Sequence, residues 1–214
     1  MKNKPKTLTL YLLRHGESVA NVTHTFASKK LDLPLTDFGT NQVEQIVEPM
    51  KKIGFSKIYA SPLLRAQQTA EIIGKASELK PIIIESLREI DVGELDGKCI
   101  EDTDYRKIYD DVISKWDKGE NDIGFKQGEN LKMVGQRIKD FLKVLDGGKD
   151  ERVLIVAHGL FFMAFIWLFC DNHGQSYNSG RINRCHYSVI QNNGEKFHIV
   201  EHDVAPENSK KGKY

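Results

Sequence analysis

Cysteine is scarce in this sequence, and no two cysteines have the spacing of a metal-binding or redox motif. The 214 residues include three cysteines, Cys99, Cys170 and Cys185. An odd number without a CxxC pair favours free thiols in a reducing compartment over a disulfide scaffold. A disulfide between two of them is still compatible with the sequence. We therefore expect a cytoplasmic protein.

Long apolar runs are also missing. The longest one, Leu160–Cys170, has 11 residues, whereas a membrane-spanning helix needs about 20, so this run predicts a buried helix. A shorter run at 8–13 ends directly in Arg14-His15, without the small-residue cleavage site of a signal peptide. We interpret the shorter run as the first strand of the fold and expect no membrane partner.

The sequence has no excess of either charge. Its 31 basic and 30 acidic residues give a net charge of +1, which argues against nucleic acid as a partner and leaves any anion binding to local geometry. Its length suits one domain. We expect a single domain over 1–214, with a helical insert at about 99–128 over the functional site and a disordered, lysine-rich tail at about 207–214.

Helical and strand patterns alternate along the chain. Apolar spacings of three and four residues predict helices at 37–53, 105–116 and 131–145, one opened by Ser61-Pro62, and one after residue 157. Short apolar runs predict strands at 8–13, 57–60, 81–85 and 152–157, and a closing hairpin at 185–191 and 196–200. This order predicts an α/β fold, a three-layer α/β/α sandwich with a mostly parallel central sheet.

Several local signals refine these boundaries. Thr36 and Gly54 are suited to cap the helix at 37–53, and Pro49 predicts a kink within it. Ser61 followed by Pro62 predicts the cap and first position of the next helix. The Ile-Ile-Ile run within 81–85 predicts a buried strand.

Polar side chains follow the predicted parallel strands, where open α/β sheets bind ligands. The strand ends are followed by Arg14-His15-Gly16, by Ser61 to Arg65, by Leu87-Arg88-Glu89 and by Ala157-His158-Gly159. An arginine fork binds phosphate oxygens, a neutral imidazole can attack phosphorus, and a carboxylic acid can protonate a leaving alkoxide. Each tripeptide alone is a weak signal. Their joint occurrence at strand ends predicts a phosphate-ester site. Glycines at 16 and 159 would let the backbone come close to the ligand.

Five separated stretches together resemble the histidine phosphatase superfamily, also called the phosphoglycerate mutase-like family. They agree with its motifs in order and read LLRHGESVAN at 12–21, LDLPLTDFG at 31–39, YASPLLRAQQTAE at 59–71, LREIDVGELDGK at 87–98 and VLIVAHGLF at 153–161. The resemblance implies that His15 is the nucleophile and becomes phosphorylated. It implies that Arg14, Arg65 and His158 hold the phosphoryl group and that Glu89 is the proton donor.

The resemblance also implies contacts around these five residues. Asn21 would add a donor to the phosphoryl group, and the backbone amides of Gly159 and Leu160 would contact the substrate. In this fold the segment 21–34, which includes Ser28, and the insert build the leaving-group pocket. The family uses no metal, so neither a metal nor another cofactor is expected.

The sequence departs from the phosphoglycerate mutases at positions where they carry cations. Thr25 stands for an arginine, Ile100 stands for a lysine, and the insert offers one arginine, Arg106, in place of a pair. We therefore expect a metal-independent phosphomonoester phosphatase for a small phosphate ester. A phosphoglycerate mutase and a non-catalytic phospho-ligand-binding protein remain alternatives, and a homodimer is left open.

Lysines offer a second set of cations near the predicted pocket. The candidates for binding another anionic group of the substrate are Lys29, Lys30, Lys98 and Lys126. Each one alone is more often a solvated surface charge. Asp91 and Glu94 are the next candidates after Glu89 for the proton donor.

Overall fold

The structure is a computed structural model that describes residues 8–145, 152–192 and 196–206. The predicted tail at 207–214 and most of the predicted hairpin turn lie outside the described residues. Within the described residues, no helix is both long and apolar enough to cross a membrane. All three cysteines are free thiols, as expected.

A six-stranded sheet lies at the centre of the molecule, in the order β3-β2-β4-β1-β5-β6. The strands span Thr9–Arg14 (β1), Lys57–Ala60 (β2), Ile82–Ile83 (β3), Arg152–Ala157 (β4), Tyr187–Asn192 (β5) and Phe197–Val204 (β6). The first four pair in parallel, whereas β5 is antiparallel to both β1 and β6. The prediction of a mostly parallel sheet closed by a hairpin is confirmed.

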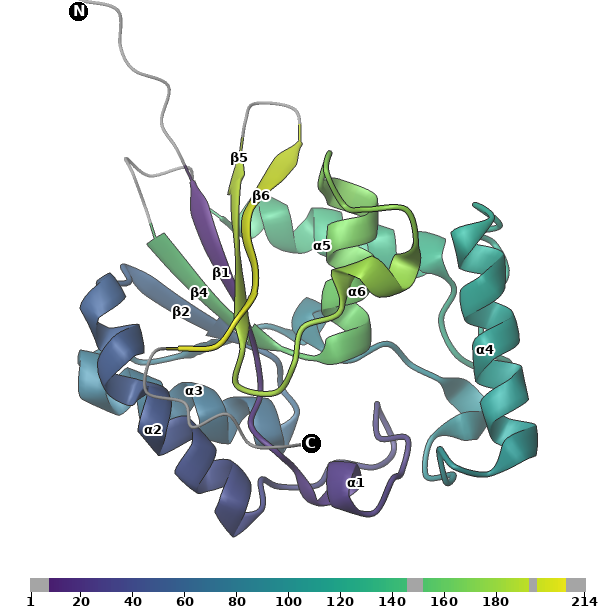
Figure 1. Cartoon of the computed structure of the whole chain (residues 1–214), viewed down its shortest axis with the longest axis horizontal. Helices are drawn as coiled ribbons and strands as arrows, with labels where there is room; N and C mark the ends of the chain where they lie inside the picture. Colours follow the sequence, from purple (N-terminus) through teal and green to yellow (C-terminus); the bar gives the residue numbers. More distant parts are fainter. Residues whose placement is uncertain (1–7, 146–151, 193–195, 207–214) are drawn as a thin grey trace, which may run out of the picture.

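Helices cover both faces of this sheet (Figure 1). The longer ones are α2 (Asp37–Ile53), α3 (Leu64–Ser77), α4 (Thr103–Asp117), α5 (Leu131–Val144) and α6 (Gly159–Phe169), and α1 (Val19–Val22) is a single turn. Side chains of α2 and α3 pack in one apolar cluster, and side chains of α4, α5 and α6 pack in the other. Because β1 and β4 lead to helices on opposite faces, a crevice forms between their carboxyl ends.

The two central strands are mostly apolar. Leu10, Leu12 and Leu13 of β1 and residues 153–157 of β4 are all buried. Continuous apolar strands of this kind are typical of a parallel sheet covered on both faces. Thr36 caps α2 by accepting from the N–H of Gly39, and α2 continues through Pro49.

Two local predictions are wrong. The strand around Ile82 and Ile83 is short and forms the edge of the sheet, and these two side chains are 45% and 43% exposed because no layer covers them. Helix α3 begins at Leu64 rather than after Ser61. The backbone N–H of Ser61 instead extends the pairing of β2 by donating to the carbonyl of Val156.

Candidate active site

Two histidines leave the sheet side by side. In the parallel pairing of β1 with β4, Arg14 lies opposite Ala157, so the next residues, His15 and His158, are neighbours at the carboxyl ends of the strands. Their ring centroids are 5.1 Å apart. Both rings are buried. The sheet register alone therefore brings together residues that are far apart in the sequence.

His15 is held in the form that a nucleophile needs. Its Nδ1 lies 2.6 Å from the carbonyl oxygen of Gly16, which can only accept, so we assign the ring proton to Nδ1. Nε2 keeps its lone pair and accepts from Nε of Arg65 at 3.1 Å. Burial, followed by the charges of Arg65 and Arg14, holds the pKa of His15 well below its ordinary value. The imidazole is therefore neutral at physiological pH.

His158 is oriented by the hydroxyl of Ser61. Nε2 of His158 lies 2.6 Å from Oγ of Ser61, and that oxygen also accepts from the N–H of Leu63 at 3.2 Å. This arrangement favours donation from the hydroxyl to Nε2, which leaves the proton of His158 on Nδ1. Burial is the largest cause that lowers the pKa of His158, so this ring is also neutral.

Two arginines are tied to backbone carbonyls beside the histidines. Arg65 donates through Nη2 to Ala27 at 2.9 Å, and its Nη1 lies 3.9 Å from Asp32, beyond hydrogen-bond distance. Arg14 donates through Nη1 to Ile182 at 2.9 Å. Burial lowers the pKa of Arg14 to about 10, so its guanidinium stays charged at neutral pH.

Three buried nitrogen atoms of these side chains lack a hydrogen-bond partner among residues 8–145, 152–192 and 196–206. They are Nε of Arg14, Nη1 of Arg65 and Nδ1 of His158. Buried polar groups in proteins are nearly always hydrogen-bonded, and a buried unpaired donor is costly. A phosphoryl group offers several charged acceptor oxygens. The donor set around His15 therefore fits a phosphoryl group.

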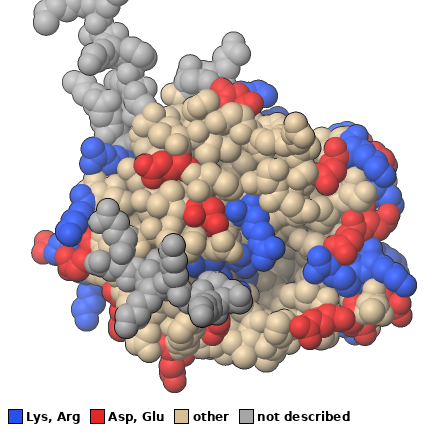
Figure 2. Space-filling view, viewed as in Figure 1, with Lys and Arg blue, Asp and Glu red and all other residues tan. Residues whose placement is uncertain are grey.

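A cavity of about 300 Å³ opens next to these groups. Figure 2 shows a hollow on this face with basic side chains at its border. The residues predicted for the site line this cavity, except His158, whose ring packs beside His15; the lining ones are Arg14, His15, Asn21, Ser28, Arg65, Glu89, Gly159 and Leu160. The volume is at the lower end of the range for small-molecule sites.

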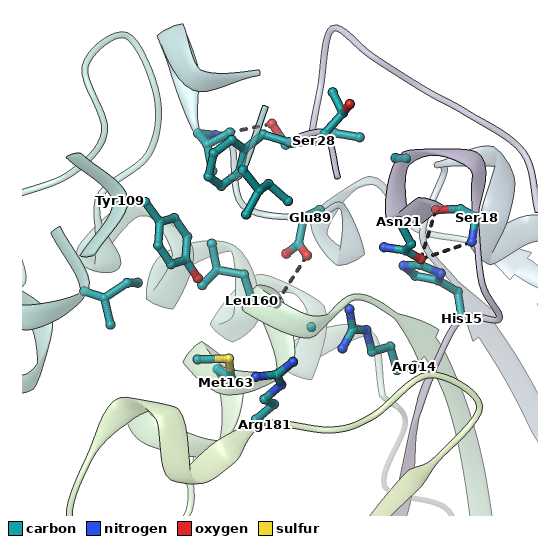
Figure 3. A pocket seen from close by; sticks show the side chains of 18 of the residues that line it. Arg14, His15, Ser18, Asn21, Ser28, Glu89, Tyr109, Leu160, Met163 and Arg181 are labelled. Atoms are coloured by element: carbon teal, nitrogen blue, oxygen red, sulfur yellow. Dashed lines mark hydrogen bonds between the residues drawn. The ribbon is translucent and has the colours of Figure 1, made fainter. Parts of the chain in front are cut away.

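Glu89 is held at the amino end of α6. Its Oε1 accepts from the backbone N–H groups of Ile90 at 2.9 Å and Phe161 at 2.8 Å, and its Oε2 accepts from that of Leu160 at 3.2 Å. The first N–H groups of a helix have no partner within the helix. Glu89 therefore caps α6 from another part of the chain, with its carboxylate facing the cavity (Figure 3).

Asn21 and Ser28 differ in what they offer a ligand. Oδ1 of Asn21 accepts from the N–H and the hydroxyl of Ser18 at 3.0 and 3.1 Å, which leaves its NH₂ group as a donor on the cavity side (Figure 3). The hydroxyl of Ser28 donates to Asp96 at 3.1 Å. Ser28 therefore holds a neighbouring loop and has no O–H left for a substrate.

The Leu160 amide and the two glycines make close contacts within the protein. The N–H of Leu160 donates to Glu89. A Cβ on Gly159 would lie 3.1 Å from Cζ of Arg14, and a Cβ on Gly16 would lie 2.7 Å from the carbonyl oxygen of Gly39. Gly159 therefore gives room to the Arg14 guanidinium. Gly16 lets the chain that follows β1 approach α2.

The lysines proposed for a second anionic group do not line the cavity within the described part of the chain. Lys29 pairs with Asp91 at 3.2 Å, and Lys126 pairs with Glu94 at 2.9 Å. Asp91 and Glu94 are poor candidates for the proton donor, because each is paired with a lysine and neither lines the cavity.

The cavity is also lined by Arg106, which the sequence analysis named only as the arginine of the insert, and by two residues that it missed, Tyr109 and Arg181. Tyr109 and Arg106 come from α4, and Arg181 follows the short helix η3 (Tyr177–Gly180). Arg106 is paired with Asp110 at 2.9 Å. No motif marks Arg181, because it lies in a connecting loop before β5.

The comparisons with known proteins agree with this geometry. Residues 10–204 match the family described as Histidine phosphatase superfamily (branch 1). The chain is 34% identical over 159 residues to "Probable phosphoglycerate mutase GpmB" of Proteus mirabilis, over 72% of this chain and 70% of that protein. It is 29% identical over 194 residues to "Uncharacterized phosphatase PhoE" of Bacillus subtilis, over 90% of this chain and 93% of that protein.

A solved structure shows the same fold. Bacillus stearothermophilus YhfR superimposes with a TM-score of 0.75 at 26% identity, over 92% of this chain and 96% of that one. The resemblance drawn from the five sequence stretches is confirmed. On its sequence and its fold, this chain belongs to the histidine phosphatase superfamily, branch 1.

Proposed function

We propose that this chain is a phosphomonoester phosphatase that acts on a small phosphorylated metabolite through a phosphohistidine at His15. One observation carries the proposal: a neutral His15 whose Nε2 lone pair faces a set of buried donors that lack partners in the described chain. Such donors stabilise the charge of a transferring phosphoryl group without reorganisation.

The first half of the reaction breaks the ester. Nε2 of His15 attacks phosphorus while the bond from phosphorus to the ester oxygen breaks. The Arg65 N–H that occupies the Nε2 lone pair moves to a phosphoryl oxygen. Glu89, protonated at this stage, gives its proton to the departing oxygen, and the alcohol leaves.

The second half releases phosphate. Water attacks the phosphorus of phosphorylated His15, and the carboxylate of Glu89 accepts the proton that the water loses. The bond from phosphorus to Nε2 breaks, so inorganic phosphate leaves and His15 is regenerated. Each turnover thus consumes one ester and one water.

Hydrolysis of a chromogenic aryl phosphate in the presence of a chelator tests the proposal. We expect steady release of phosphate, because His15 supplies the nucleophile and the arginines supply the positive charge. A protein that only binds phosphorylated ligands would bind the ester without turnover. That result would replace the proposal by the non-catalytic alternative.

A phosphoglycerate mutase is the second candidate, because the relatives called GpmB carry that name. A mutase must keep water from its phosphohistidine and hold a bisphosphorylated intermediate, whose charges are costly to leave unpaired. Thr25 and Ile100 line the cavity where mutases carry cations. Incubation with 3-phosphoglycerate and a trace of 2,3-bisphosphoglycerate should therefore release phosphate faster than it forms 2-phosphoglycerate. Isomerisation that clearly outruns phosphate release would promote the mutase.

Replacement of Glu89 by glutamine separates acid catalysis from helix capping. The amide oxygen can still accept from the α6 backbone, but the side chain can no longer give a proton to a leaving group. We expect kcat to fall by about 100-fold or more on alkyl phosphates and far less on aryl phosphates, whose leaving groups need little protonation. Equal losses on both substrates would assign the role to another group.

A further inference from the structure

We propose that Arg181 and the hydroxyl of Tyr109 form a second anion-binding subsite, so that the substrate is a phosphate monoester whose leaving group carries another carboxylate or phosphate. The inference rests on the proposed function for the place of the reacting phosphoryl group. It adds the chemistry of the rest of the substrate, which the motifs around His15 leave open.

Arg181 lines the cavity, and its guanidinium has no partner among the described residues. Four arginines line the cavity, namely Arg14, Arg65, Arg106 and Arg181. The first two belong to the phosphoryl site, and Arg106 is neutralised by Asp110. Arg181 is exposed, and its guanidinium makes no hydrogen bond or ion pair within 8–145, 152–192 and 196–206.

The neighbours of Arg181 strengthen its attraction for an anion. Figure 3 shows the side chains of Arg181 and Arg14 extending into the same cavity. The charge of Arg181 reaches both Arg14 and Tyr109. It is one of the contributions that act to lower the pKa of the Arg14 guanidinium and of the Tyr109 phenol. Two nearby cations both attract an anion that enters the space.

Tyr109 supplies a neutral donor on the same side. Burial is the largest cause that raises the pKa of Tyr109 to about 12, so the phenol stays protonated at neutral pH. Its ring is fixed against Phe26 and Phe125 at centroid distances of 5.5 and 5.9 Å. The hydroxyl points toward the cavity, on the side away from His15 (Figure 3).

The two elements that carry the subsite are locked together. Trp116 of α4 contacts Tyr177 of η3 with ring centroids 5.3 Å apart. Asp117 accepts from the backbone N–H of Tyr177. Leu160 and Met163 add apolar side chains to the lining of the same cavity. A substrate with a short stem between two anionic ends would reach both the phosphoryl site and Arg181 within this one cavity.

Binding of non-hydrolysable phosphonates tests the subsite without requiring turnover. Calorimetry would compare propylphosphonate with 3-phosphonopropionate and with propane-1,3-bisphosphonate. Because a hydrogen bond to a charged group contributes about 1.5–3 kcal/mol, we expect the doubly anionic ligands to bind about 10- to 100-fold more tightly. The carboxylate and bisphosphonate arms then show which anion the subsite prefers.

Variants of Arg181 assign the preference to this residue. Arg181→Gln should remove most of the preference, since it should weaken the doubly anionic ligands by a much larger factor than propylphosphonate, and Arg181→Lys should restore part of it. Tyr109→Phe should weaken the preference by a smaller factor. The control is Arg152→Gln, at the opposite end of β4, which should keep the wild-type ratio. Equal affinities of wild type for all three ligands, or a ratio unchanged in Arg181→Gln, would overturn the inference.

The corresponding esters keep this result separate from the proposed function. If wild type hydrolyses propyl phosphate but Arg181→Gln lowers kcat/KM equally for singly and doubly anionic esters, the phosphatase stands and the subsite fails. If no ester is hydrolysed but the phosphonate ratio depends on Arg181, the subsite stands and the phosphatase fails.

Discussion

His15→Ala should abolish turnover on every phosphate ester, aryl esters included. The covalent route then has no acceptor for the phosphoryl group, and water is not positioned by another base. The ring of His15 is neutral, and its Nδ1 donates to Gly16. Nε2 is therefore the atom that the phosphoryl group should join.

Rapid quenching with labelled substrate identifies the intermediate. We expect label on His15 that is lost in acid and retained in base, as for a phosphoramidate bond. The matched control is His198→Ala, an exposed histidine on β6 that pairs with Asp171, which should keep wild-type labelling and rates. Label on a serine or an aspartate, or turnover by His15→Ala, would contradict the covalent role of His15.

Arg65→Ala should lower kcat by about 100-fold or more. Arg65 is the one side chain that touches Nε2 of His15 while also keeping an unpaired N–H toward the site, within the part of the chain that is described. Its loss removes positive charge from the transition state and a constraint on the nucleophile. Arg65→Lys should recover little, because a lysine is a point charge without the planar fork.

Inhibition by vanadate separates this effect from misfolding. Vanadate adopts the five-coordinate geometry of the transition state, so it should compete with substrate in wild type and bind much more weakly to Arg65→Ala. The control Arg152→Ala, outside the cavity, should keep both the rate and the inhibition. An unchanged rate in Arg65→Ala would mean that this guanidinium does not contact the phosphoryl group.

The sequence by itself determined the order of the elements and the catalytic set. Apolar spacings of three and four residues located the longer helices, because burial of one face imposes a regular spacing on the chain. Short continuous apolar runs located β1, β2 and β4, which are covered on both faces. Parallel strands place their carboxyl ends at one edge, so the residues after them had to meet there. His15, Arg65 and Glu89 followed from that rule together with the family motifs.

Only the tertiary structure decided which polar groups remain for a ligand. The Leu160 amide and the Ser28 hydroxyl are near the cavity, but Glu89 and Asp96 use them. Hydrogen bonds between segments that are distant in the sequence leave no periodic signal, so no local pattern could reveal that they are taken. The same holds for Ser61, whose hydroxyl orients His158 instead of capping α3.

The second anion-binding subsite also depends on tertiary packing. Arg181 lies in a loop without a motif, and Tyr109 lies on the insert helix α4 among alternating polar and apolar residues. Contacts between α4 and η3 bring them to one cavity. Charge neutralisation is likewise a matter of three-dimensional distance. Lys29 and Lys126 are paired with carboxylates, whereas the Arg181 guanidinium has no carboxylate partner in the described part of the chain. A Coulomb interaction depends on separation in space and not along the chain.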